Sequence, residues 1–179
     1  MNFDFSDDQK MLRDQARKFL AEKSSRKAVR DVLNDAAKSH DVALWKGVAD
    51  QGWLGVAIPE EHGGLGLGGL ELCVLAEEIG RAVAPIPFSS TVYFFSEAVL
   101  AAGSPAQKSS LLPKIVSGDL IGAFAVSEGP GAPSPSSIEA SFDGAKLSGV
   151  KIPVTDGDIA THALVLAREA GGLSLVLVD

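Results

Sequence analysis

The spacing of hydrophobic residues changes at Gly118. Before it, apolar side chains recur three and four positions apart, as on one face of an α-helix, whereas after it they occur in short runs bounded by turn residues, as in β-strands. We therefore predict an α+β fold, with an all-α helical domain over residues 1–118 and a partial β-barrel-like domain over residues 119–179. A few short strands with open edges make a poor independent unit, so we expect this β domain to be incomplete, either truncated or covered by another chain.

Capping residues and glycines divide the helical part. Ser6 is a good N-cap residue, and Gln9 stands where its side chain completes a capping box, so the first helix is expected to begin there. The segment 89–102 is apolar around most of its circumference and predicts one buried helix. Pro113 is expected to kink or divide the last helical segment. The remaining helices are expected in a segment that ends near Asn34, at about 41–51, at 70–82 and, last, at 104–118.

Short apolar runs between turn residues predict the strands. Asp143 and Gly144 form a strong hairpin signal between two of these runs, and Gly171-Gly172 provides a turn between the last two. The candidate strands lie at 121–127, 137–142, 146–150, 162–167 and 173–179.

The charge balance and the cysteine usage exclude several classes of protein. Lys and Arg number 16 against 23 Asp and Glu, a net charge of −7, which argues against a nucleic-acid partner because phosphate binding needs clustered cations. No apolar run approaches the roughly 20 residues of a membrane span, and the N-terminus lacks the pattern of a signal peptide. Cys73 has no partner for an intrachain disulfide, which favours a cytoplasmic location.

The glycine-rich segment 52–69 contains the string G-x-G-x-x-G at residues 64–69, which is typical of dinucleotide-binding loops. In those proteins the string follows a strand, whereas here it follows helix and loop, so a turn-rich connection is the favoured interpretation. The three histidines lie far apart in the sequence without ligand spacing, and no metal site is predicted.

Two features of the 70–82 helix have both a structural and a catalytic interpretation. We favour Cys73 as a small buried apolar residue over a nucleophile. Glu77 and Glu78 are adjacent, so their side chains point about 100° apart on a helix. A solvated face, or partners for Arg81, is therefore favoured over a catalytic carboxylate pair.

The segment 123–128 ends a strand and runs directly into a loop of proline and glycine. Such a strand end presents backbone N–H groups and the Ser127 hydroxyl to whatever lies against it, and a planar ring system is one candidate ligand. On these residues alone, a plain strand end is the favoured interpretation, because turns after strands are common.

A resemblance to a known family rests on six segments in a fixed order, which together cover essentially the whole chain. They are G-W-L-G-V-A-I-P-E-E-H-G-G-L-G at 52–66, E-E-I-G-R at 77–81, L-L-P-K-I-V-S-G at 111–118, A-F-A-V-S-E at 123–128, L-S-G-V-K at 147–151 and L-V-L-A-R at 164–168. On these motifs the sequence resembles the acyl-CoA dehydrogenase family.

The resemblance implies an N-terminal helical domain and a middle β domain that clamp FAD, with a C-terminal helical domain that completes the site and mediates tetramer formation. It implies a flavoprotein oxidoreductase of fatty acid metabolism, a homotetramer or hetero-oligomer, that carries out α,β-dehydrogenation of an acyl-CoA thioester. In that family a glutamate removes the α proton, the β hydrogen leaves as hydride to the flavin, and electrons pass to an electron-transfer flavoprotein.

The resemblance also implies site residues, position by position. Phe124, Val126 and Ser127 should line the flavin ring, Ser127 through its backbone N–H and hydroxyl. Thr155 should contact the flavin as well, and Ser134 should face the phosphate or the acyl-CoA substrate. The family's catalytic glutamate usually lies in the C-terminal domain, so no catalytic residue is assigned in this chain.

Departures from the family pattern leave an alternative open. Pro133 stands in place of a glycine and offers no backbone N–H, and Pro135 stands in place of an aspartate. Pro153 stands where an aromatic ring often packs on the flavin. Pro133 and Pro153 favour a non-catalytic or half-site subunit that supports a partner carrying the flavin and the base. A related flavin oxidase, acting with oxygen or on a nitroalkane, is a third alternative.

Overall fold

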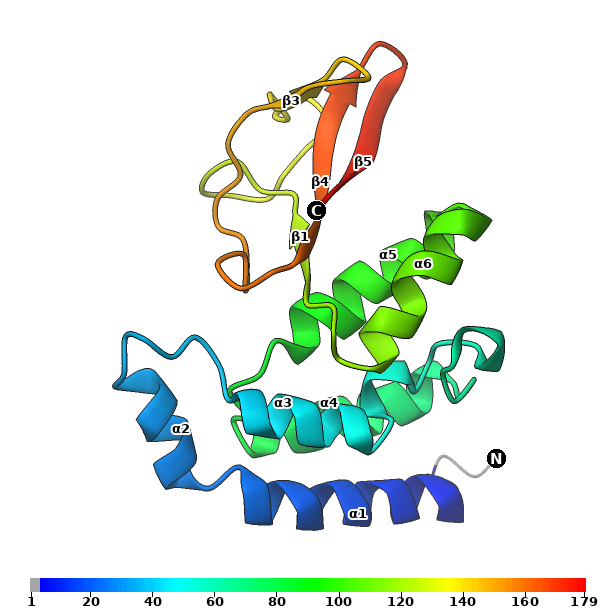
Figure 1. The fold of residues 1–179 in the computed structure, drawn as a ribbon, viewed down its shortest axis with the longest axis vertical. Coiled ribbons are helices and arrows are strands. Elements are labelled where there is room, and N and C mark those ends of the chain that lie inside the picture. Colours follow the sequence, from blue (N-terminus) through cyan, green and yellow to red (C-terminus); the bar gives the residue numbers. More distant parts are fainter. Residues whose placement is uncertain (1–3) are drawn as a thin grey trace.

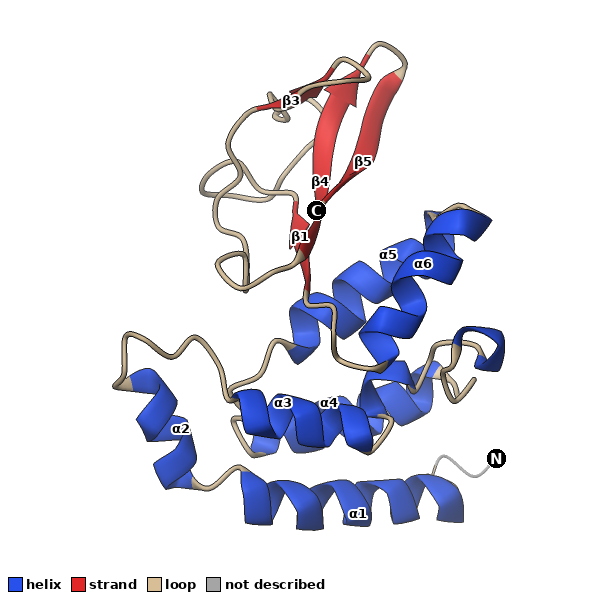
Figure 2. Ribbon diagram, in the orientation of Figure 1, coloured by secondary structure: helices blue, strands red, loops and turns tan. Residues whose placement is uncertain are grey.

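The computed structural model describes residues 4–179 and places helices at one end of the molecule and a sheet at the other (Figure 1, Figure 2). The α+β architecture predicted from the hydrophobic spacing is confirmed. The helices are α1 (Asp7–Lys23), α2 (Arg26–Leu33), α3 (Val42–Asp50), α4 (Gly69–Arg81), α5 (Glu97–Ala102) and α6 (Pro105–Val116), with two 3-10 turns, η1 (Trp53–Gly55) and η2 (Glu60–His62), and a π-helix, η3 (Ser89–Ser96). The strands are β1 (Gly122–Ala125), β2 (Ser141–Phe142), β3 (Leu147–Ser148), β4 (His162–Glu169) and β5 (Gly172–Val178).

The start of α1 follows the predicted capping box. The Ser6 hydroxyl accepts a hydrogen bond from the backbone N–H of Gln9 at 3.2 Å, and the Gln9 side chain accepts one from the backbone N–H of Ser6 at 3.0 Å. These two bonds pair backbone donors that the first turn of a helix leaves without intrahelical partners. Local sequence therefore determines where α1 begins.

Two expectations in the helical part need correction, namely the division of the last helix at Pro113 and the single buried helix over 89–102. The α6 helix is not divided at Pro113, because the carbonyl that the missing N–H would have paired with belongs to Ser109, an exposed residue that water can reach. The expected single helix over 89–102 is a π-helix followed by α5, and it is not buried all round: Phe94 is 53% exposed.

The remaining differences concern the α4 helix. Cys73 is exposed rather than buried, because α4 turns Val74, Leu75 and Glu78 toward the interior. Glu78 is not on a solvated face but almost fully buried, and its partners include Arg81, as predicted.

Two apolar clusters make up the core. One joins the helices to one another around Trp45, Trp53 and Leu75. The other joins the helices to the sheet, and its members include Phe95 of η3, Leu112 of α6 and Leu164 of β4. The sheet is thus attached to the helical part by apolar packing that converges on η3 and α6.

Strand β4 lies between its neighbours in the sheet. On one side β1 runs parallel to it, with Gly122 opposite His162, and β2 meets it further along at Arg168; on the other side β5 forms an antiparallel hairpin with it. The hairpin predicted at Asp143 and Gly144 joins β2 to β3.

The two strands of the β2–β3 hairpin are shorter than the sequence pattern predicts. Residues 137–140 lie outside β2 because the Glu128 carboxylate accepts the backbone N–H groups of Glu139 and Ala140, at 2.7 and 2.9 Å. A side chain therefore takes donors that a longer strand would have used in its ladder.

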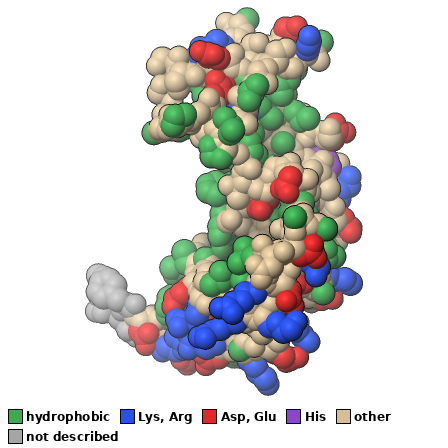
Figure 3. All heavy atoms as spheres, turned by 90° about the vertical axis from the view of Figure 1, so that its left-hand side faces the viewer, with side chains coloured by type: hydrophobic (Ala, Val, Ile, Leu, Met, Phe, Trp, Pro, Cys, Tyr) green, Lys and Arg blue, Asp and Glu red, His purple; other side chains and the backbone are tan. Residues whose placement is uncertain are grey.

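The surface differs between the two ends. A view onto the side that lies at the left of Figure 1 shows Lys and Arg side chains gathered at the helical end and hydrophobic side chains spread over the β part (Figure 3). No helix within residues 4–179 has both the length and the apolar character that crossing a bilayer demands.

Candidate functional site

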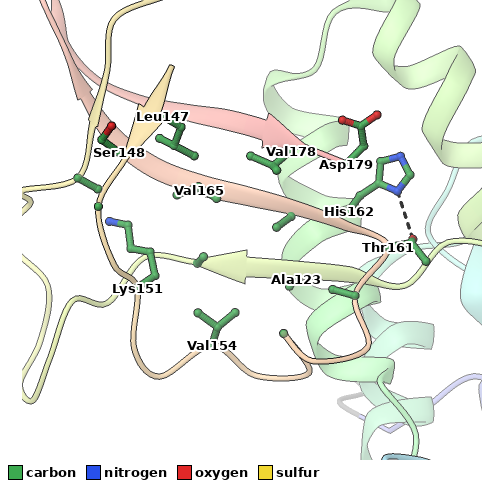
Figure 4. Close-up of a pocket in the computed structure, with 16 residues that line it drawn as sticks. Ala123, Leu147, Ser148, Lys151, Val154, Thr161, His162, Val165, Val178 and Asp179 are labelled. Atoms are coloured by element: carbon green, nitrogen blue, oxygen red, sulfur yellow. Dashed lines mark hydrogen bonds between the residues drawn. The ribbon is translucent and has the colours of Figure 1, made fainter. Parts of the chain in front are cut away.

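The alternation of side chains along β1 creates two different surfaces. Ala123 and Ala125 face a broad hollow of about 420 Å³ on one side of the sheet, where Val165 and Val178 also point (Figure 4). Phe124 and Val126 point the other way, toward η3, and line a second pocket of about 330 Å³.

The second pocket brings together the residues that the resemblance singles out. Its lining consists of Ser90 and Phe94 from η3, Phe124, Val126 and Ser127 from β1 and its end, and Pro153 and Thr155 from the segment before β4. We call this set the η3–β1 pocket. The four positions implied to contact a flavin therefore lie around one space, although Thr155 is distant from the others in sequence.

Ser134 does not line the η3–β1 pocket. It lies in the exposed loop before β2, where its backbone N–H donates to the Ser137 hydroxyl at 2.9 Å and the Ser137 hydroxyl donates to its carbonyl at 3.0 Å. These bonds hold the loop in a local turn. The structure gives Ser134 no contact with the other predicted site residues.

Sequence analysis missed the two residues that η3 contributes. Ser90 and Phe94 carried no motif, and the expected buried helix gave no reason to place either beside a ligand. Phe94 stacks on Phe124 with ring centroids 6.0 Å apart and an interplanar angle of 16°. The pocket wall therefore includes an aromatic pair formed between the helical part and the sheet.

The end of β1 is held against the Thr155 segment by backbone and side-chain bonds. A parallel bridge pairs Glu128 with Ile152, and the backbone N–H of Ile152 donates to the Ser127 carbonyl at 2.8 Å. Beside it, the Lys151 ammonium donates to Glu128 at 2.6 Å and to the Val126 carbonyl at 3.2 Å. These contacts bring Ser127 and Thr155 to the same pocket.

Glu128 is the most strongly perturbed carboxylate at this site. Its hydrogen bond with Lys151, together with those from the backbone N–H groups of Glu139 and Ala140, lowers its pKa to about 2. A carboxylate that is so strongly stabilised in its ionised form is a poor proton acceptor at neutral pH. Glu128 therefore holds the site together and is unsuited to act as a catalytic base.

The pocket's polar groups suit a ligand with a hydrogen-bonding edge. Within residues 4–179, the hydroxyls of Ser127 and Thr155 have no hydrogen-bond partner, so both are available to a ligand. Beside them lie the rings of Phe94 and Phe124 and the apolar side chains of Val126 and Pro153. This donor set fits a planar, largely apolar ring system with polar atoms along one edge, such as the isoalloxazine of a flavin.

The larger hollow on the opposite face offers less chemistry. Half of its lining residues are alanine or valine (Figure 4). The Lys151 ammonium, which also lines it, is already hydrogen-bonded to Glu128. His162 and Thr161 at its end hydrogen-bond to each other at 3.2 Å. Across residues 4–179, no group of three or more His, Cys, Asp or Glu side chains is placed to hold a metal ion.

A family model described as "Acyl-CoA dehydrogenase, N-terminal domain" matches residues 6–119, which is more than half of the chain. The chain belongs to the acyl-CoA dehydrogenase family. Among curated relatives, the mitochondrial 2-methylacyl-CoA dehydrogenase of Solanum tuberosum is 35% identical over 169 residues, which cover 90% of this chain and 40% of the relative.

Solved structures of acyl-CoA dehydrogenases have the same fold. A variant of the Tcur3481-Tcur3483 steroid ACAD superposes with a TM-score of 0.84 at 36% identity, over 96% of this chain and 48% of that one. The ChsE4-ChsE5 complex from Mycobacterium tuberculosis superposes with a TM-score of 0.88 at 26% identity, over 100% of this chain and 49% of that one. The chain thus spans less than half of the length of these relatives.

Proposed function

We propose that this chain binds the flavin ring of FAD in the η3–β1 pocket and forms part of an acyl-CoA dehydrogenase that carries out α,β-dehydrogenation of an acyl-CoA thioester. The observation that supports this proposal is the convergence of Phe124, Val126, Ser127 and Thr155 on one pocket, in a chain of this family. The bound flavin supplies the acceptor for the hydride that leaves the substrate.

The residues of the pocket have separate tasks in this proposal. Phe124, Val126 and Pro153 exclude water from the face of the ring. The hydroxyls of Ser127 and Thr155 donate to its polar edge and fix its orientation. Among the described residues, no carboxylate lines the pocket. In this proposal, the base that removes the α proton is therefore not one of the residues that line the η3–β1 pocket.

FAD titration of the purified chain tests the proposal. We expect the visible spectrum of oxidised FAD to shift from that of the free cofactor as it binds the chain, and we expect Thr155→Ala or Phe124→Ala to weaken binding roughly tenfold. Ser110→Ala is the matched control, because Ser110 is exposed on α6, outside the pocket, and its loss should leave the FAD affinity unchanged. A spectrum that stays that of free FAD at every concentration of the chain contradicts the proposal.

The second candidate function is a non-catalytic or half-site subunit whose partner carries the flavin and the base. The presence of Pro153 in the lining of the η3–β1 pocket favours it, since a small aliphatic ring covers less of a flavin face than an aromatic one. A colourless chain that forms a stable complex with a flavin-containing dehydrogenase subunit would support this function over the first.

The wider assignments rest on the family resemblance. We propose an electron-transfer flavoprotein as the electron acceptor, a homotetrameric or heteromeric assembly, a role in fatty acid metabolism and a cytoplasmic location. We also propose that Ser134 contacts the acyl-CoA, in which case Ser134→Ala raises KM for the thioester without changing the affinity for FAD. The domain division at residues 118 and 119 belongs to the same set of proposals.

A further inference from the structure

A hydrogen bond between η3 and the segment that carries Thr155 crosses the edge of the η3–β1 pocket. The Ser90 hydroxyl is 2.6 Å from Asp156 Oδ2, and Ser90 is 2% exposed. Ser90 lines the pocket, and Asp156 follows directly after Thr155. This contact joins residues 66 positions apart and connects the helical part of the molecule to the segment that bears one of the pocket's two free hydroxyls.

The backbone of Asp156 gives this hydrogen bond a structural consequence. Asp156 has φ of +55°, in the left-handed region, where aspartate is tolerated better than most residues because its short side chain can bond locally. Its carbonyl accepts the backbone N–H groups of Ile159 and Ala160, at 3.2 and 3.0 Å, so Asp156 begins the turn that leads to β4. The Ser90 hydroxyl therefore holds the first residue of that turn from the side of η3.

The attachment of η3 to the sheet does not depend on Ser90. The Thr91 hydroxyl accepts the backbone N–H of Gly122 at 3.1 Å, and Phe95 packs in the cluster that joins the helices to the sheet. Loss of the Ser90–Asp156 bond is thus expected to release the Thr155 segment while η3 and β1 stay in place. Release of the Thr155 segment without movement of η3 or β1 would distinguish a positioning role of Ser90 from a purely structural one.

We propose that Ser90 and Asp156 are positioning residues for the η3–β1 pocket, which hold Thr155 at a fixed distance from η3 so that its hydroxyl meets the edge of a bound flavin ring. The identity of the ligand in this inference rests on the proposed function. The positioning of the Thr155 segment by Ser90 and Asp156 does not depend on it. Neither residue exchanges a proton or electron with a substrate in this role.

Three variants of the full 179-residue chain test the inference. Ser90→Ala removes the donor, Asp156→Gly removes the acceptor while it allows the positive φ, and Asp156→Asn keeps an oxygen acceptor and also tolerates that backbone. Thr91→Ala is the control, because it removes a different bond between η3 and the sheet.

The first measurement needs no cofactor. Amide hydrogen exchange in the peptide 153–160 should become faster in Ser90→Ala and Asp156→Gly, and stay close to the wild-type rate in Asp156→Asn and Thr91→Ala. The second measurement is the Kd for FAD, which should rise about tenfold in the first two variants and be restored by Asp156→Asn.

The outcomes separate the two proposals. Unchanged exchange in Ser90→Ala and Asp156→Gly, with circular dichroism showing both variants folded, overturns the positioning inference whatever the FAD result. Faster exchange in a wild-type-like fold that never binds FAD supports the positioning of the segment and overturns the proposed flavin site. Faster exchange with an unchanged Kd for FAD overturns the role of the pair in ligand placement.

Discussion

At the scale of single residues, Glu128 carries the densest set of polar contacts near the site. Its carboxylate accepts from the Lys151 ammonium and from two backbone N–H groups, and the Lys151 side chain is only 7% exposed. Removing the charge leaves a buried ammonium without its counter-ion, which is costly in a poorly solvated position. The Glu128–Lys151 pair therefore stabilises the junction between the end of β1 and the Thr155 segment.

We expect Glu128→Gln to lower the melting temperature at pH 7 and to make stability less sensitive to acid. Because folding lowers the pKa of Glu128 from 4.5 to about 2, the ionised pair contributes fully above pH 4.5, and that contribution is lost as the pH falls from 4.5 through 2. The difference in stability between wild type and variant, measured by urea unfolding across this range, should shrink as the pH falls. Glu139→Gln, at an exposed neighbouring position, is the control; an equal effect there would contradict the assignment.

A second prediction at this scale concerns Gly122, the first residue of β1. A Cβ at this position would lie 2.3 Å from Cγ of Phe95, which is fully buried and cannot move away. Gly122→Ala is expected to lower the free energy of unfolding by about 3 kcal/mol, the upper end for overpacking a core. Gly80→Ala has open space around its Cβ and lies in α4, so it should instead raise stability by about 0.5–1 kcal/mol. Denaturant titration of both variants distinguishes steric conflict from a general intolerance of alanine.

At the scale of elements, α1 and α4 are joined by a carboxylate that is almost fully buried. Glu78 of α4 accepts two hydrogen bonds from the guanidinium of Arg17 in α1, at 2.6 and 3.1 Å, and forms an ion pair with Arg81 at 3.3 Å. The hydrogen bond from Arg17 is the largest cause of the lowered pKa of Glu78. Two helices that also share the core around Leu75 are thus fixed in register by a bidentate contact.

We expect Glu78→Ala to lower the free energy of unfolding by about 2 kcal/mol, less than for a fully buried pair because both arginines are about half exposed. Its neighbour Glu77 is exposed and, among the residues from 4 to 179, pairs only with Arg81 on the surface of the helix. Glu77→Ala should therefore change stability by no more than about 0.5 kcal/mol. Equal losses in the two variants, measured by urea unfolding, would show that burial of the Glu78 carboxylate is not what matters.

At the scale of the whole molecule, the η3–β1 pocket lies between the helical part and the sheet. Ser90 and Phe94 belong to the helical part, and the remaining lining residues belong to β1 and the segment before β4. A ligand that contacts both parts stabilises the folded state of each, since it binds only when both are in place.

FAD at 100 times its Kd is expected to raise the stability by about 2.7 kcal/mol and the melting temperature by roughly 5–10 °C. Fluorescence of Trp45 and Trp53 reports on unfolding of the helical part, and hydrogen exchange in β4 and β5 reports on opening of the sheet. FAD should stabilise the two parts together, so both measurements should show the same protection against unfolding. ADP, which lacks the flavin ring, is the control and should protect neither part through this pocket. Protection of one part alone would contradict a ligand site between them.

Much of this fold could be predicted from local sequence, because the interactions that determine it span a few residues. Contacts between near neighbours in the chain form the capping box at Ser6 and Gln9 and the hairpin turn at Asp143 and Gly144. The residue types at these positions therefore predict the local structure. The motifs also indicated which side chains of β1 share one face of the strand, since alternation along a strand follows from the backbone alone.

The contacts between distant segments were decided only by the tertiary structure. The exposure of Cys73, the stacking of Phe94 on Phe124 and the Ser90–Asp156 hydrogen bond each depend on how η3 and α4 pack against the rest of the chain. Helical periodicity identifies an apolar face but does not say which other segment will cover it, nor which polar side chain will meet a partner 66 residues away. Those choices are made by packing of the whole core, where the position of each side chain depends on all of its neighbours.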